Sequence, residues 1–391
     1  MTHQPATESD FCAIVADARA KKTPLAIEGG GTRAGLGRPT QTAETLSTRA
    51  LNGVVFYEPA EMVICARAGT PLADIEALLV ERKQILPFEP PDHRRLYGSS
   101  GAPTIGAVAA CNLSGARRIS AGAARDSLIG VRFVNGAGEA IKSGGRVMKN
   151  VTGLDLVKLS AGAHGTLGVL TEVTFKLLPT PETSATLVIK GLDDARAVEA
   201  LAQALGSPFE VSGAAHLPPG AGGAEARTLL RIENFEASVA YRIAELRKLV
   251  GGDVTLDDSA SRALWRDVGE CAFFAAPDAR AVWRVSTAPS RAPDLVRLVQ
   301  RNGAVAHFYD WGGGLVWLAV DAAGDAREKD VRAAVATCGG HATLVRAPDE
   351  VRARVDVFQP LAAPLMKLTR DVKASFDPDG VLNPGRMYAG V

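Results

Sequence analysis

The spacing of hydrophobic residues predicts alternating helices and strands over the first part of the chain. Apolar residues recur at helical spacing in residues 11–20, which predicts a helix there. A second helix is expected to begin at Pro71, behind a Thr70 cap. Little regular structure is expected in residues 99–122. Strands are expected where apolar runs are short or alternate with polar residues, at 25–28, 54–57, 62–68, 128–134, 139–142 and 169–177.

The pattern changes after Pro181. Strands are expected at 186–190, 229–232, 282–286, 307–309 and 315–320, and helices at 195–204, 237–250, 326–336 and 361–376. Residues 213–223 are expected to form a flexible loop, and residues 311–315 a hairpin turn. The repeated strand–helix–strand order predicts an α+β unit with helices on one face of an antiparallel sheet. The expected domains are residues 1–181, 182–345 and 346–391.

Composition narrows the possible functions of this 391-residue chain. A net charge of +1 and only 5% aromatic residues leave no basic, stacking surface for nucleic acid. The five cysteines are widely spaced, without a Cys-x-x-Cys pair, so zinc-ribbon and iron–sulfur ligand sets are not expected. An odd cysteine count behind a polar N-terminus predicts reduced thiols in a cytoplasm. No apolar stretch approaches the roughly 18 residues of a membrane span.

Three glycine-rich segments lie ahead of predicted strands. In residues 29–37, backbone N–H groups could converge on an anion, with Thr32 and Arg33 adding a hydroxyl and a charge, although a flexible turn is an equal alternative. The segment is neither a Walker A loop nor the Rossmann pattern. Residues 103–115 are almost all small, which suits either close packing or a flat polar ligand. Residues 149–171 again deliver glycines into a strand.

The order of these segments, with residues 125–130 and 377–386, resembles the FAD-binding family of the vanillyl-alcohol oxidase and D-lactate dehydrogenase type, also called PCMH-type. Residues 115–118, 121–126 and 383–386 are similar to the E-subunit family of bacterial glycolate oxidases. The resemblance covers residues 20–180 and the tail well, and the middle of the chain loosely. It implies two α/β subdomains that hold FAD, with an α+β cap domain inserted before the tail.

The same resemblance implies which residues hold FAD. The pyrophosphate would be wrapped by Gly29, Gly30, Gly31, Thr32, Arg33 and Ala34, and the flavin and its phosphates lined by Thr104, Gly106, Asn112, Ser114 and Gly115. The adenine or flavin edge would be approached by Gly162, Gly165, Gly168 and Val169, and the flavin would be reached from the tail by Asn383 and Arg386. A cation such as Arg386 near the pyrimidine end of a flavin would stabilise its reduced anion.

Departures from the family pattern refine these expectations. Some members attach FAD covalently through histidine or cysteine, but no histidine lies near residues 29–37, and Cys111 stands in a different motif. We therefore expect non-covalent FAD. Members that use a metal carry a Gly-Asp/Glu-Gly-Asn-x-His pattern, whereas His216, His307 and His341 are scattered here. We expect no metal site.

Several single residues keep two interpretations. His164 would bond to backbone or contact the flavin edge, and His93 is expected at the solvated surface. His307 is a weak candidate for a general base in the cap, or would face solvent or a partner. Arg117 and Arg118 would bind a carboxylate or an FAD phosphate, or lie at the surface.

The resulting hypothesis is an FAD-dependent oxidoreductase acting on CH–OH groups, as one flavin subunit of a complex that oxidises glycolate to glyoxylate. Its partners would be a second FAD subunit and an iron–sulfur subunit that receives the electrons. The alternatives are a stand-alone FAD oxidase or dehydrogenase of another 2-hydroxy acid or alcohol, and an assembly subunit without FAD. The expected location is cytoplasmic, with any membrane association peripheral, through partners at the cytoplasmic face of the inner membrane.

Overall fold

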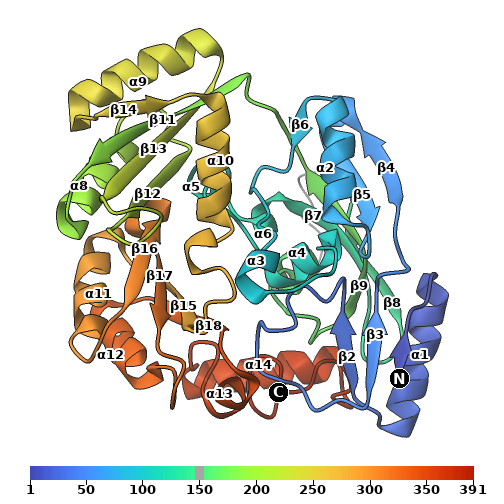
Figure 1. Cartoon of the computed structure of the whole chain (residues 1–391). Helices are drawn as coiled ribbons and strands as arrows, with labels where there is room; N and C mark the ends of the chain where they lie inside the picture. The colour runs from blue at the N-terminus through green and yellow to red at the C-terminus, as the bar shows by residue number, and fades with distance from the viewer. Residues whose placement is uncertain (146–153) are drawn as a thin grey trace.

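The computed structural model describes residues 1–145 and 154–391. The start of the third glycine-rich segment, including Asn150 and Thr152, lies outside them. The chain forms a first half with two main sheets, a second half with one large sheet, and a tail that returns to the first half (Figure 1). None of the helices in the described part has the length and apolar character needed to span a membrane.

The larger sheet of the first half has five antiparallel strands in the described residues, in the order β4-β5-β9-β7-β8. Its strands are β4 (Val54–Glu58), β5 (Val63–Arg67), β7 (Leu128–Val134), β8 (Ala140–Gly144) and β9 (Val169–Lys176). Phe133 and Phe175 are buried on it in one apolar cluster with residues of α2 (Leu72–Glu81) and α4 (Ile105–Cys111). Packing against this sheet therefore holds α4 in position.

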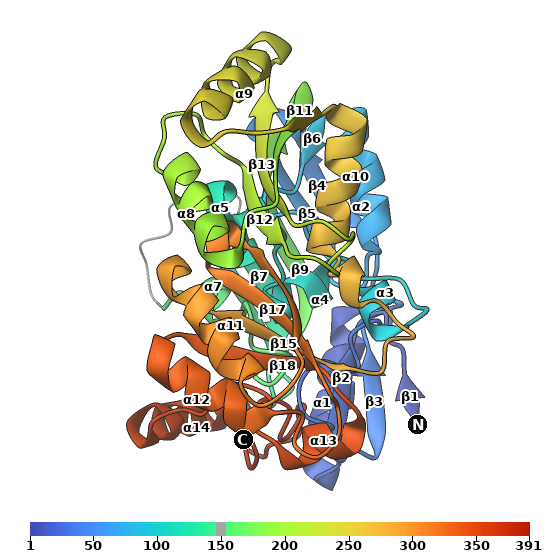
Figure 2. The same ribbon diagram turned by 60° about the vertical axis from the view of Figure 1, so that its left-hand side comes forward.

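The smaller sheet is parallel and adjoins the tail. It consists of β1 (Thr2–His3), β2 (Leu25–Glu28) and β3 (Glu44–Ser47), beside α1 (Glu8–Lys21). After α14 (Ala363–Phe376), Leu382 forms a parallel bridge to Leu25. Lys373 Nζ donates to the carbonyls of Thr166 and Leu382, at 2.7 Å each. The end of the tail is thus joined to the first half, whereas Val351, Val355 and Val357 pack in an apolar cluster of the second half. Figures 1 and 2 show the tail running beneath both halves.

The second half is built on an eight-stranded antiparallel sheet, counted in the described residues, which we call the cap sheet. Its strands are β11 (Thr183–Lys190), β12 (Gly213–Leu217), β13 (Arg227–Asn234), β14 (Val254–Leu256), β15 (Ala281–Ser286), β16 (Ala306–Asp310), β17 (Leu315–Val320) and β18 (His341–Arg346). The order β14-β11-β13-β12-β16-β17-β15-β18 describes two β-α-β-β-α-β units joined edge to edge where His216 pairs with Tyr309.

The two faces of the cap sheet have different neighbours. The outer face is covered by α8 (Asp194–Leu205), α9 (Glu236–Val250), α11 (Ala292–Gln300) and α12 (Glu328–Cys338). On the inner face, Trp317 and Phe308 share an apolar cluster with Leu96 of the first half and with Trp265 of α10 (Asp258–Gly269). The inner face therefore forms the contact with the first half. The short remaining elements are α3 (Arg94–Tyr97), α5 (Arg118–Ala121), α6 (Ala124–Ser127), α7 (Leu156–Ser160), α13 (Asp349–Arg354), β6 (Gln84–Ile85) and β10 (Leu178–Pro179).

Most elements expected from clear periodicity are confirmed, including α1, β9 and the antiparallel cap sheet. The expectation of a flexible loop over residues 213–223 is wrong for residues 213–217, which form the fully buried central strand β12, whereas residues 218–223 contain no helix or strand. The small residues of β12 hide a strand pattern. The expectation of little structure in residues 99–122 misses α4 and α5. The helix expected at Pro71 begins one residue later, and the Thr70 hydroxyl donates to the Arg67 carbonyl at 2.7 Å instead of capping it.

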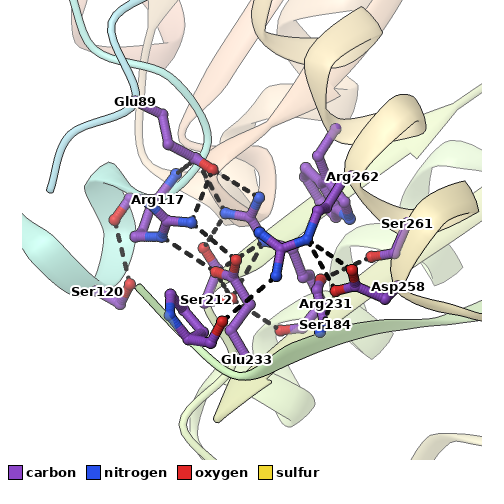
Figure 3. Close-up of polar contacts among 12 residues, drawn as sticks. Glu89, Arg117, Ser120, Ser184, Ser212, Arg231, Glu233, Asp258, Ser261 and Arg262 are labelled. Atoms are coloured by element: carbon purple, nitrogen blue, oxygen red, sulfur yellow. Dashed lines mark hydrogen bonds and ion pairs between the residues drawn. The ribbon is translucent and has the colours of Figure 1, made fainter. Parts of the chain in front are cut away.

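A buried ionic cluster joins the two halves (Figure 3). Glu89 and Arg117 belong to the first half, and Arg231 and Glu233 to β13. Both Nη atoms of Arg231 donate to the Glu89 carboxylate, at 2.8 and 3.0 Å. Arg117 donates to Glu233 from Nε at 3.0 Å and from Nη2 at 2.7 Å. The four charges cancel, so each half neutralises charge on the other.

Burial makes this cluster sensitive to the loss of any member. The side chains of Arg231 and Glu233 are 3% and 4% exposed. Burial alone would raise the pKa of Glu233, but the Arg231 and Arg117 guanidiniums lower it to about 2. Ser212 donates to Glu233 at 2.7 Å, and its own oxygen accepts from Arg231. Removing one partner of such a buried pair leaves an uncompensated charge.

We predict that Arg231→Met lowers the free energy of unfolding by about 3–5 kcal/mol, because Glu89 and Glu233 lose the charge between them. Arg262→Met is the control. Its partner Asp258 is partly exposed, so the loss should stay below about 1 kcal/mol. Urea unfolding of both variants measures the difference, and equal losses would contradict the assignment.

Candidate functional site

The glycine-rich loop after β2 forms one wall of a cavity of about 110 Å³ in the first half. Gly106 near the start of α4, Gly165 and Gly168 before β9, and Asn383 and Arg386 from the tail form the other walls. The expected FAD-binding residues that line it are Gly29, Gly30, Gly31, Thr32, Arg33, Ala34, Gly106, Gly165, Gly168, Asn383 and Arg386. Segments far apart in the sequence thus meet at one site. We call it the FAD cavity.

Close packing against residues 102–104 explains why the loop after β2 needs glycine. A Cβ built on Gly30 would lie 1.7 Å from the carbonyl oxygen of Ala102. A Cβ built on Gly29 would lie 2.2 Å from Thr104 Oγ1. The loop backbone is therefore pressed against residues 102–104 without intervening side chains. Backbone without side chains allows a phosphate to approach closely.

Arg33 supplies positive charge to this cavity. It is 6% exposed, and its Nη2 donates to the carbonyls of Pro91 at 2.5 Å and Asp92 at 3.2 Å. Its Nε and Nη1 are buried and have no partner within residues 1–145 and 154–391. Buried guanidinium groups without acceptors are costly, and diphosphate oxygens are suitable acceptors for them. The site therefore fits the diphosphate of FAD.

The tail closes the cavity through side-chain bonds to the backbone. Asn383 Oδ1 accepts from Ile27 N at 2.8 Å, and Nδ2 donates to the His164 carbonyl at 2.8 Å. Arg386 Nη2 donates to the Ala34 carbonyl at 3.2 Å. Asn383 adopts a φ of 43°, in the left-handed region that asparagine tolerates better than most residues. These bonds place the Arg386 guanidinium beside the glycine loop.

A second cavity of about 90 Å³ lies between the first half and the inner face of the cap sheet. Leu36, Cys111 and His164 line both cavities, so the two are neighbours. Among the residues lining the second cavity are Asn112, Ser114 and Gly115 from the first half and Arg284, Asp310, Trp317 and Thr343 from the cap sheet. We call it the cap cavity.

Polar groups of residues 112–115, which follow α4, form hydrogen bonds that hold one wall of the cap cavity in place. Asn112 Oδ1 accepts from Arg125 N, and Ser114 Oγ accepts from Ala124 N, at 2.9 Å each. The Gly115 carbonyl accepts from Trp311 Nε1 of the cap at 3.1 Å. These bonds fix the backbone of the segment against both α6 and the cap.

Two charged residues of the cap sheet face the cap cavity. Burial raises the pKa of Asp310 to about 7, while the hydrogen bond from Trp311 N, at 2.7 Å, opposes that rise. Burial also lowers the pKa of Arg284 to about 10, and Arg118 adds to that effect. Asp310 and Arg284 form no hydrogen-bonded ion pair, but the charge of each favours the charged form of the other. A group that titrates near neutral pH in a cavity is suited to exchange protons with a ligand.

The histidines at the site are buried, which corrects the expectation that His93 is solvated. His93 is 4% exposed, and burial together with Arg33 lowers its pKa to about 3. Burial and Arg386 lower the pKa of His164 to about 4. Both imidazoles are therefore neutral at pH 7. The ring of His164 faces both cavities, while its backbone carbonyl accepts from Asn383.

The structure does not support His307 as a general base at this site. Its Nε2 lies 2.8 Å from Asp194 Oδ2, which also accepts from the Tyr309 hydroxyl at 2.7 Å, on the outer face of the cap sheet. His216 Nε2 lies 3.4 Å from the other oxygen of Asp194. His307 lines neither cavity. In the described part of the chain, no group of histidine, cysteine and acidic side chains is arranged to hold a metal.

A few expected site residues lie outside the cavity linings. Thr104 is buried behind Gly29, Val169 belongs to the core at the start of β9, and Gly162 N donates to the Ala109 carbonyl at 3.2 Å. Arg117 binds Glu233 in the ionic cluster and is not at the surface. The guanidinium of Arg118 lies over the Trp311 ring, 4.2 Å from its centroid.

The cap residues that line the cap cavity were not predicted from the sequence. Arg284 interrupts the apolar strand Ala281–Ser286, and that interruption was the available clue. Asp310 directly precedes the turn formed by Trp311–Gly313, which joins the paired strands β16 and β17 as expected. Neither position could be placed in a cavity before strand pairing was known.

We predict that Arg33→Met weakens FAD binding by about 10- to 100-fold, the effect of losing charge-assisted bonds worth about 1.5–3 kcal/mol. Arg95→Met is the control, because Arg95 is exposed, pairs with Asp267 and lines neither cavity. Flavin content and the Kd for FAD after reconstitution measure the effect. Unchanged FAD affinity in Arg33→Met, with a thermal stability equal to that of wild type, would show that the diphosphate lies elsewhere.

We predict that Asp310 makes the protein less stable as pH rises. Its pKa increases on folding from 3.8 to about 7, so the native state holds the extra proton between these values. The contribution of this proton to the free energy of unfolding is fully present below about pH 4 and is lost by about pH 8. It amounts to at most about 4 kcal/mol. Asp310→Asn keeps an acceptor for Trp311 N but does not titrate. Urea unfolding of both proteins at several pH values should show the curves separating. Parallel curves would contradict the raised pKa.

Comparison with known proteins agrees with this geometry. The FAD binding domain family model matches residues 1–144. The chain is 38% identical to glycolate oxidase subunit GlcE of Escherichia coli (strain K12), over 94% of this chain and 93% of that protein. It is 31% identical to glycolate oxidase subunit GlcD of Bacillus subtilis (strain 168), over 47% of this chain and 38% of that protein.

The fold is also found in a solved structure. 4-Ethylphenol oxidase from Gulosibacter chungangensis superposes with a TM-score of 0.76 and 16% identity, over 99% of this chain and 89% of that chain. This likeness confirms the expected FAD-binding fold with an α+β cap. Because the similarity to GlcE extends over nearly the whole of both chains, this protein belongs to the glycolate oxidase subunit GlcE family of FAD-dependent oxidoreductases.

Proposed function

We propose that this chain is the FAD-binding subunit of a glycolate oxidase complex that converts glycolate to glyoxylate. The observation that carries the proposal is the 38% identity to GlcE over 94% of this chain. The neighbouring FAD cavity and cap cavity support it, because a flavin held by the first half would face the cap sheet. A small 2-hydroxy acid would then be bound between the halves.

The residues proposed to hold FAD belong to the first half and the tail. Arg33 and the glycine loop would bind the diphosphate, while Asn383 and Arg386 close the cavity from the tail. FAD, when bound, supplies an acceptor for two electrons and a proton. The Arg386 guanidinium would favour negative charge near it. Gly29, Thr104 and Gly162 would act through backbone shape, as their packing suggests.

We propose that the FAD is non-covalent. Cys111 is the thiol nearest to such an attachment, since it lines both cavities. Burial raises the pKa of the Cys111 thiol, so little of the nucleophilic thiolate exists at pH 7.

The complex would contain a second FAD subunit of the GlcD type and an iron–sulfur subunit that accepts electrons. The partial similarity to GlcD supports the first partner. The missing Gly-Asp/Glu-Gly-Asn-x-His pattern supports a division of roles between two flavin subunits. We propose a cytoplasmic location, with peripheral attachment to the inner membrane through these partners.

The proposed domains are residues 1–181 for FAD binding, 182–345 for the cap and 346–391 for the returning segment. Two features support these boundaries. β10 (Leu178–Pro179) pairs with β6 of the first half, whereas β11 (Thr183–Lys190) begins the cap sheet. The last strand of that sheet ends at Arg346, and the chain then leads through α13 and α14 to Leu382.

The experiment is an absorption spectrum of the purified chain before and after acid precipitation, followed by anaerobic glycolate. A flavin band released by acid is expected, with glycolate bleaching it in the presence of the partner subunits. A chain that binds no flavin under any condition would overturn the proposal. Full bleaching and steady turnover by the chain alone would favour the stand-alone oxidase or dehydrogenase.

A further inference from the structure

The inner face of the cap sheet carries an arginine, Arg284, that forms no ion pair with a described residue, although the charge of Asp310 lies near enough to stabilise it. Arg284 lies in the middle of β15, opposite Trp317 on β17 and Thr343 on β18. All three residues line the cap cavity. The preceding and following residues, Trp283 and Val285, belong to the apolar cluster of the outer face. The alternation of the strand therefore turns Arg284 toward the first half.

Other enclosed cap arginines have acceptors, and Arg284 does not. Arg231 donates to Glu89, Arg346 to the carbonyls of Leu96 and Phe274, and Arg352 to the Gly37 carbonyl. Within the described parts of the chain, no carbonyl or carboxylate accepts from Arg284, and its guanidinium contacts the Trp311 ring, 4.9 Å from the centroid. An enclosed cation without a partner is unfavourable unless a ligand supplies the anion.

The indole of Trp311 holds this guanidinium in place. Arg118 lies 4.2 Å and Arg284 4.9 Å from the Trp311 ring centroid, so two cations share one aromatic side chain. Trp311 has a φ of 54°, a left-handed conformation that is rare for a bulky residue, and its Nε1 donates to the Gly115 carbonyl. The strained turn therefore fixes the indole between the halves, with positive charge on the cavity side.

Asp310 completes the chemistry of the cavity. One of its oxygens accepts from Trp311 N at 2.7 Å, and the carboxyl group lines the same cavity as Arg284 without an ion pair to it. The space between them would accept a ligand with a carboxylate at one end and a hydroxyl near it. The Thr343 hydroxyl, on the strand next to Arg284, is a further donor for an anion.

We propose that Arg284 binds the carboxylate of a small 2-hydroxy acid in the cap cavity, with Thr343 as a second donor and Asp310 as the acceptor for the hydroxyl group. The choice of substrate class rests on the proposed function. The inference goes beyond it by assigning the residues that bind each end of the acid. The side chain of Arg284 suits this role, because a guanidinium binds a carboxylate through two parallel hydrogen bonds.

The test is calorimetric titration of the purified chain with oxalate, a two-carbon acid that cannot be oxidised as glycolate is. We expect saturable binding that Arg284→Gln weakens at least tenfold. Arg284→Lys, which keeps the charge but not the paired geometry, should lose less. Arg297→Gln on the exposed outer helix α11 is the matched control and should bind oxalate like wild type. Inorganic phosphate, titrated in parallel, distinguishes a carboxylate site from a phosphate site.

Flavin content and melting temperature are measured on each protein. Arg284→Gln should retain FAD and melt no lower than wild type, because it removes an unpaired charge. Wild type that binds no oxalate, equal oxalate binding by Arg284→Gln, or tighter binding of phosphate would each overturn the inference. Loss of FAD together with oxalate in both Arg284 variants would overturn it too, by assigning the arginine to the cofactor. A wild-type chain that lacks FAD but binds oxalate through Arg284 would instead overturn the proposed function alone.

Discussion

The buried cluster of Glu89, Arg117, Arg231 and Glu233 is the constraint on which the arrangement of the site depends. The cap cavity has one wall in each half, so its shape exists only while the halves keep their relative position. Apolar contacts between the halves tolerate small sliding movements. Paired hydrogen bonds between guanidinium and carboxylate groups do not, because their geometry is directional. The cluster therefore sets the register of the cap sheet over the FAD cavity.

The sequence was informative about the fold where local periodicity coincided with burial. β9 alternates along its length, and α1 has one apolar face, so both could be predicted. β12 could not, because Gly213, Ala214 and Ala215 are small and the strand is buried on both faces, which removes the alternation. The repeated strand–helix–strand order was predicted, but the edge-to-edge pairing of two β-α-β-β-α-β units was not. It is a property of strand order, and strand order depends on contacts between distant residues.

The candidate site also has a part that the sequence predicted and a part that it did not. The FAD cavity depends on glycines. Where close backbone contact leaves no space for a Cβ, as at Gly30 beside Ala102, the position must be glycine, and the sequence shows it. The cap cavity depends on which face of a strand meets the other half. His307 and Asp310 both lie on β16, yet the first faces Asp194 on the outer side and the second lines the cap cavity. Strand alternation places these two residues on opposite faces, but the sequence alone does not tell which face meets the first half.

The charge balance of the two sets of buried arginines links the fold to its chemistry. In the ionic cluster, each arginine faces a glutamate of the other half, and the ensemble is neutral. Arg33 and Arg284 form no ion pair within the described residues, although each faces a cavity. The chain neutralises the arginines of the ionic cluster but provides no ion pair for Arg33 and Arg284 within its described residues. These two positions are therefore suited to anions that come from bound ligands. A dinucleotide diphosphate satisfies the first arginine, and the carboxylate of a small acid satisfies the second.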